Sequence, residues 1–87
     1  MTWHRADEGD LPEVGDEIAL CIFALGDTGV KHWKRMRVEI IYHRHDQPRI
    51  LGPGLHDTGP EPDWPERPDN LVGRAVFWKR HEEAQRV

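Results

Sequence analysis

The sequence contains a single cysteine and no serine among its 87 residues. One cysteine excludes an intramolecular disulfide and a zinc site built from cysteines, and the lack of serine excludes a serine nucleophile. Cys21 lies within an apolar run, where a thiol usually packs as a small buried side chain. We therefore expect Cys21 to be inert, because a catalytic thiol needs an exposed and electropositive environment.

Long hydrophobic runs are also missing. The longest run, 18–25, contains eight apolar residues, far fewer than the roughly 20 that a membrane-spanning helix needs. The first eight residues contain no apolar signal segment. The sequence therefore predicts a cytoplasmic protein that has no membrane partner.

The motifs of several enzyme classes are absent. No glycine-rich loop precedes a helical segment, and no Glu and His have the helical spacing of a metalloprotease. The tripeptide Asp-Thr-Gly of aspartic proteases occurs at 27–29 and 57–59, but its flanking residues resemble loops rather than the apolar strand that such an enzyme needs. We interpret both tripeptides as turns capped by aspartate, and we expect neither an enzyme nor a cofactor.

Charge is unevenly distributed along the chain. The net charge is −4, and acidic residues are concentrated in 1–17 and 51–70, whereas 30–50 contains six Lys or Arg against two acids. An acidic chain is repelled by nucleic acid overall, so only the basic segment could attract phosphate. The short length allows one domain with a small core.

Proline, glycine and apolar runs divide this domain into five segments. They are an acidic lead-in at 1–16, a β core at 17–51, a proline- and glycine-rich loop at 52–70, a last strand at 71–79 and a polar tail at 80–87 that is long enough for one helical turn. Eight Pro or Gly residues in the loop exclude regular secondary structure there.

The β core contains three expected strands. Residues 17–25 are apolar on both faces, as is typical of a central strand, and 30–43 alternates, with Met36, Val38, Ile40 and Tyr42 on the buried face. A turn at 43–48 leads to a short strand at 49–51. With the last strand, the pattern predicts an all-β fold. It is either a small twisted antiparallel sheet or an SH3-like, partly closed barrel of four to five strands.

Histidines near the end of the second expected strand offer a possible metal site. His43 and His45 are two residues apart and would share one side of a strand. Together with His56, His32 or Asp46 they could supply three ligands. The alternative is that they are exposed turn histidines, because Pro48 indicates that the strand ends nearby.

The basic segment 31–37 and the tryptophans are the candidate binding residues. Trp33 lies among cations, a composition typical of single-strand nucleic-acid binding, although an exposed sheet face would have the same pattern. Trp64 lies in a proline-stiffened loop and would either fold back over the core or anchor a partner. We predict that Trp33, Arg35, Arg37 and Trp64 contact the partner.

Both ends of the chain resemble a known family. The segment from Trp3 through Leu11-Pro-Glu-Val-Gly15, the apolar strand that follows, and Val76-Phe-Trp78 are similar to short phage and prophage proteins of unknown function. That family opens with Trp and then Leu-Pro-x-x-Gly, and it closes near a strand that contains Trp. The resemblance implies a small phage accessory protein that is not an enzyme.

The sequence thus predicts a small protein-binding module. In its most specific form, the module is a phage or mobile-element inhibitor of a host defence or regulatory protein, because segregated charge and abundant Trp suit protein recognition. Three alternatives remain open at this point: a nucleic-acid-binding module that uses 31–37, a structural virion component, and a metal-binding protein that uses His43, His45 and His56.

Overall fold

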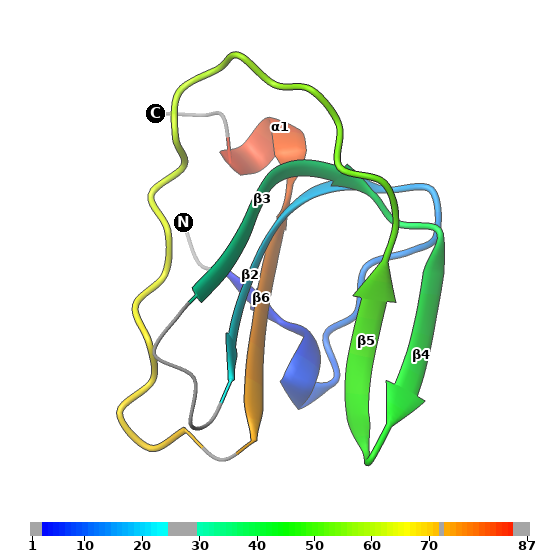
Figure 1. Ribbon diagram of the computed structural model, residues 1–87, viewed down its shortest axis with the longest axis vertical. Helices are drawn as coiled ribbons and strands as arrows, with labels where there is room; N and C mark the ends of the chain where they lie inside the picture. The colour runs from blue at the N-terminus through cyan, green and yellow to red at the C-terminus, as the bar shows by residue number, and fades with distance from the viewer. Residues whose placement is uncertain (1–2, 25–29, 72, 85–87) are drawn as a thin grey trace.

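The computed structural model describes residues 3–24, 30–71 and 73–84 and shows two antiparallel sheets (Figure 1). The four-stranded sheet has the order β1-β6-β2-β3, and the second sheet is the hairpin β4-β5. The elements are β1 (His4–Arg5), the 3₁₀ turn η1 (Ala6–Glu8), β2 (Glu17–Ala24), β3 (Val30–Arg37), β4 (Ile40–Arg44), β5 (Gln47–Leu51), β6 (Arg74–Arg80) and α1 (His81–Ala84). The all-β prediction is confirmed, but the sheets do not close into a barrel.

The apolar segment forms the central strand, as its two apolar faces predicted. β2 pairs with β3 on one side and with β6 on the other. Alternate side chains of β2 therefore enter two separate apolar clusters, one on each face of the sheet. The larger cluster includes Ile18, Leu20, Val76 and Trp78, and the smaller one is formed by Cys21, Phe23, Ala75 and Phe77.

The prediction of one strand over 30–43 is wrong. β3 ends at Arg37, and β4 begins at Ile40 in the other sheet. Val38 N–H still donates to the Asp16 carbonyl at 2.8 Å, but Glu39 N–H donates to the Leu51 carbonyl at 2.9 Å, so the backbone changes partner between these two residues and continues into the hairpin. Consequently Ile40 and Tyr42, which were expected on the buried face, are 54% and 40% exposed.

The hairpin turn is tighter than expected. His45 and Asp46 both have positive φ, 53° and 59°, which is the geometry of a two-residue type I′ turn. This turn matches the right-handed twist of the flanking strands. β5 therefore begins at Gln47 rather than at residue 49 and includes Pro48, which a two-stranded sheet tolerates because both strands are at an edge.

After β5 the chain first follows the edge of β3, where Leu55 N–H donates to the Arg35 carbonyl at 2.9 Å. It then passes to the side of the sheet away from the hairpin (Figure 1), where Trp64 and Leu71 pack on the smaller apolar cluster. The described residues of 52–71 form no strand or helix, and the one β-bridge among them joins Gly54 to Met36. The last strand, expected at 71–79, spans Arg74–Arg80. In the polar tail, α1 is a single helical turn. The four-stranded sheet thus lies between two coverings: the hairpin on one face and the long loop on the other.

Candidate functional site

A groove opens between the four-stranded sheet and the hairpin. We call this space the hairpin groove; its volume is about 300 Å³. We call the aliphatic part of its lining, which includes Leu20, Ile22 and Ile50, the floor; the rings of Trp33 and Tyr42 also line the groove. This size lies at the lower end of the range for ligand sites, about 300–1,000 Å³. The groove can therefore receive one or two side chains or a small molecule.

A β-bulge positions Trp33 in the lining of the groove. Ile18 pairs with Met36 and Leu20 pairs with Trp33, so two residues of β3 lie opposite one residue of β2. Trp33 and Met36 are three apart in the sequence, yet both face the hairpin side. Strict alternation would place them on opposite faces, and sequence analysis therefore missed this juxtaposition.

Three cations surround the groove. Lys31, Arg49 and Arg74 all line it, and none of its described lining residues is acidic. The Nε atoms of Arg49 and Arg74 are buried and have no hydrogen-bond partner among the described residues. Sequence analysis counted Arg49 only as part of a charge block, because nothing local marks either arginine as a groove residue.

The hairpin exposes large apolar side chains beside the groove. Ile40 and Leu51 are directly opposite each other across β4 and β5, and Tyr42 lies two residues along on the same face. Their exposed fractions are 54%, 48% and 40%. Tyr42 and Leu51 also line the groove, so this outer face and the groove form one continuous surface.

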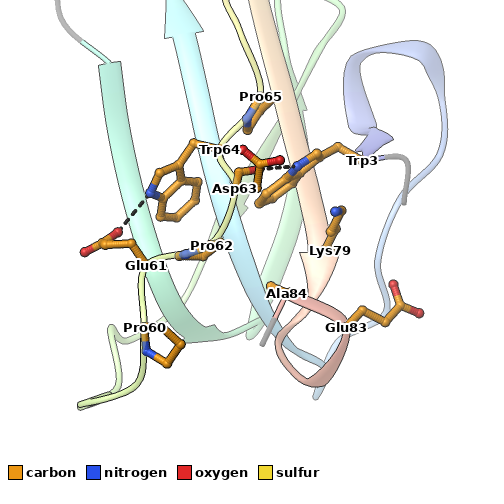
Figure 2. A pocket seen from close by; sticks show the side chains of 10 residues that line it. All are labelled: Trp3, Pro60, Glu61, Pro62, Asp63, Trp64, Pro65, Lys79, Glu83 and Ala84. Atoms are coloured by element: carbon orange, nitrogen blue, oxygen red, sulfur yellow. Dashed lines mark hydrogen bonds between the residues drawn. The ribbon is translucent and has the colours of Figure 1, made fainter. Parts of the chain in front are cut away.

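A second hollow, of about 510 Å³, lies on the loop side of the sheet, and we call it the loop hollow. Figure 2 shows Trp64 and Trp3 on either side of Asp63, with Lys79 below Trp3. The indole of Trp64 stacks on the ring of His32 at 4.3 Å and on that of Trp3 at 5.6 Å. Both Trp3 and Trp64 pack on the smaller apolar cluster, so here the loop acts as its cover.

The indole N–H groups and the ammonium group beside the loop hollow have partners. Trp3 Nε1 donates to the Asp63 carbonyl at 3.0 Å, and Trp64 Nε1 donates to Glu61 Oε2 at 2.9 Å. The Lys79 ammonium lies 4.8 Å from the centre of the Trp3 ring, and Lys79 is only 7% exposed. These contacts hold the loop against the sheet.

The second Asp-Thr-Gly tripeptide forms a capped turn, as predicted. Asp57 Oδ1 accepts a hydrogen bond from Gly59 N–H at 2.8 Å, and its other oxygen lies 2.8 Å from His81 Nε2. The Gly59 hydrogen bond and then the His81 contact lower the pKa of Asp57 below its ordinary value. The first tripeptide, at 27–29, lies outside the described residues.

The structure separates the four residues predicted to contact a partner. Trp33 lines the hairpin groove, whereas Trp64 packs on the opposite face of the sheet. Arg35 forms an ion pair with Glu17 at 2.6 Å, and Arg37 lies 4.0 Å from a carboxylate oxygen of Glu39. Of these residues, Trp33 alone lines the groove.

The histidines do not form the triad that a metal site would need. His43 lies in β4 and His45 in the following turn, because the strand ends between them. Among the described residues, no group of three or more His, Cys, Asp or Glu is close enough to hold a metal ion.

Cys21 is a core residue, as expected. Its side chain is fully buried, and burial raises the pKa of the thiol to about 12. The thiol therefore stays protonated at neutral pH and lacks the thiolate that nucleophilic chemistry requires.

The described residues contain no helix that is long and apolar enough to cross a membrane. Comparisons with protein families, with curated proteins and with solved structures give no match to this chain.

Proposed function

We propose that this chain is a non-enzymatic protein-binding module, and that the partner lies on the outer face of the hairpin and enters the hairpin groove. One observation carries the proposal: Ile40, Tyr42 and Leu51 expose large apolar side chains on one hairpin face. In a domain with a small core, apolar side chains gathered outside the core are typical of an interaction site. Tyr42 and Trp33 add aromatic contact area, which is enriched in protein interfaces.

The more specific form of the proposal names a host defence or regulatory protein as the partner. Its support is the resemblance of residues 3–15 and of Val76-Phe-Trp78 to small phage proteins. The acidic residues of the lead-in, among them Glu13, lie outside the groove and could add long-range attraction to a basic partner.

Nucleic-acid binding is the second candidate, and a particular observation favours it. The groove brings three cations together with the rings of Trp33 and Tyr42, and single-stranded nucleic acids bind to such combinations of charge and stacking surface. The net charge of −4 opposes it, because a polyanion is repelled by the rest of the chain.

The proposed function can be tested by capture and then by measured affinity. The immobilised chain is incubated with a lysate of its host cells, and the most strongly retained protein is identified by mass spectrometry and purified. Its Kd is then measured by calorimetry for the wild type and for the double variant Ile40→Thr, Tyr42→Thr. We expect the double variant to bind at least about tenfold more weakly, because buried interface anchors each contribute more than about 1 kcal/mol.

Val14→Thr is the matched control, because Val14 is 65% exposed and does not line the groove. It should bind like the wild type. All three chains should unfold at similar temperatures, since exposed substitutions usually change stability by less than about 0.5 kcal/mol. Equal affinity of the double variant and the wild type would contradict the proposal, as would the absence of any specifically retained protein.

A further inference from the structure

We infer that the hairpin groove binds a carboxylate carried on an apolar segment of the partner protein, with Arg49 and Arg74 as its hydrogen-bond donors. This inference rests on the proposed function and names the chemistry of the segment that the module recognises. Two properties of the groove carry it: three cations without an ion-pair partner among the described residues, and the aliphatic floor.

The cations call for an anion. The Nε atoms of Arg49 and Arg74 are covered by protein and have no acceptor among the described residues, so an occupant of the groove meets the two guanidinium groups through their terminal nitrogens. Neither arginine forms an ion pair with a described residue, and Lys31 adds a third positive charge to the same groove. A carboxylate has two oxygens and fits the fork of an arginine, so it satisfies such donors well.

The floor calls for an apolar group attached to that anion. Leu20, Ile22 and Ile50 form a surface with no charge of its own, and an occupant that covers it removes apolar area from water. A sugar-phosphate chain has no aliphatic group to cover this surface, and the net charge of −4 repels a polyanion. Shape and charge therefore favour a carboxylate beside a large apolar side chain.

The surface extends beyond the groove, and this favours a peptide segment over a free small acid. Tyr42 and Leu51 belong both to the groove and to the exposed face of the hairpin. An occupant longer than the groove can therefore continue along the hairpin toward Ile40, which also lies on that face. A Glu or Asp next to Leu, Phe or Met in an exposed segment has the required chemistry.

The test uses short peptides as probes and the Nε–H signals of arginine in NMR spectra of the full chain. The probe is the acetylated pentapeptide amide Gly-Leu-Glu-Phe-Gly, and its twin carries Gln in place of Glu. We expect the Glu peptide to shift the Nε–H signals of Arg49 and Arg74 and to bind at least about tenfold more tightly than the twin, because charge-assisted hydrogen bonds are strong.

Variants assign the effect to the groove. Arg49→Gln and Arg74→Gln should each weaken binding of the Glu peptide about tenfold or more, whereas Arg44→Gln, an exposed residue of the same hairpin, should leave binding unchanged. If a Gln variant does not fold, Arg49→Lys and Arg74→Lys keep the positive charge but lack the planar guanidinium fork that matches a carboxylate. They should then weaken binding several-fold.

Three results would overturn the inference. Equal binding of the Gln twin would show that there is no carboxylate site, and binding of 3-phenylpropionate as tight as that of the Glu peptide would show a pocket for free small acids. Tighter binding of a thymidine decanucleotide at the same signals would show a nucleic-acid site. None of them changes the hairpin test, in which Ile40→Thr, Tyr42→Thr is compared with the wild type on the captured protein. Failure of the inference and failure of the proposed function are therefore distinguishable.

Discussion

The two faces of the four-stranded sheet are covered in different ways. On the loop side, the polar groups of Trp3 and Trp64 have partners within the loop, and Asp57 is held by Gly59 N–H. On the hairpin side, the Nε atoms of Arg49 and Arg74 are buried without a partner among the described residues. Both coverings exclude water from apolar side chains, so burial alone does not tell them apart. The hydrogen bonds do: the indole N–H groups of the loop side have partners, whereas two arginine Nε atoms of the hairpin side have none among the described residues.

The difference also has an energetic meaning. An unsatisfied buried donor costs about 1–3 kcal/mol, which is a large amount for a domain with a small core. Binding sites commonly retain such unfavourable groups, because stability and function are selected together. The predictions below disturb the two coverings in turn, from the largest expected effect on stability to the smallest.

Gly52→Ala should destabilise the hairpin side most. A Cβ at residue 52 would collide with the carbonyl oxygen of Arg37, a backbone atom that cannot move without shifting the end of β3. We expect a loss of about 2–4 kcal/mol in the free energy of unfolding, measured by urea denaturation. Gly54→Ala is the control, because its Cβ would make only ordinary contact with Trp33 at 3.8 Å. Similar losses in the two variants would refute the packing argument.

Trp64→Ala should destabilise the loop side. The variant loses the stacking of Trp64 on His32 and on Trp3 and uncovers the smaller apolar cluster. Because Trp64 is only half-buried, we expect a loss of about 1–3 kcal/mol, and Trp64→Phe should recover part of it. Partner affinity should be unchanged under conditions where the variant is folded. An unchanged urea midpoint together with lost binding would instead identify Trp64 as an interface anchor.

Asp57→Asn should have the smallest effect, and that effect should depend on pH. The Gly59 N–H and His81 lower the pKa of Asp57 below 3.8, so the folded chain binds fewer protons at this site than the unfolded chain. The stabilisation is therefore complete above the unfolded pKa and is lost as the pH falls through the folded pKa. Thermal unfolding at several pH values should show a difference between the two chains that disappears in acid. A difference that grows in acid would contradict this assignment.

Local sequence patterns were sufficient for much of the fold. The apolar run of β2 predicted a central strand because both of its faces carry apolar side chains, and the structure places β3 and β6 on its two sides. The burial of Cys21 and the aspartate-capped turn at Asp57 followed from equally local chemistry. In each case the deciding interaction lies within a few residues or depends on hydrophobicity alone.

Long-range contacts decided the features that the sequence did not predict. The break after Arg37 involves a change of backbone partner, from the lead-in at Val38 to Leu51 at Glu39, for which the alternating pattern contains no signal. The groove depends on the same break, because only a separate hairpin can bring Arg49 close to Arg74. Arg49 and Arg74 are 25 positions apart in the sequence, and they line the same groove only because of the way the strands are connected. Composition contains no information on such a contact.

The bulge in β3 has a consequence for how the chain tolerates changes in length. Lys34 and Arg35 together lie opposite Ala19. Deletion of one of them would therefore keep the strand pairs on either side of the bulge, and the faces of their side chains, unchanged. Deletion of His32 would reverse the face of the residues before it and would carry Lys31 away from the groove. Natural relatives that are one residue shorter in this strand should therefore lack the bulge and keep the groove.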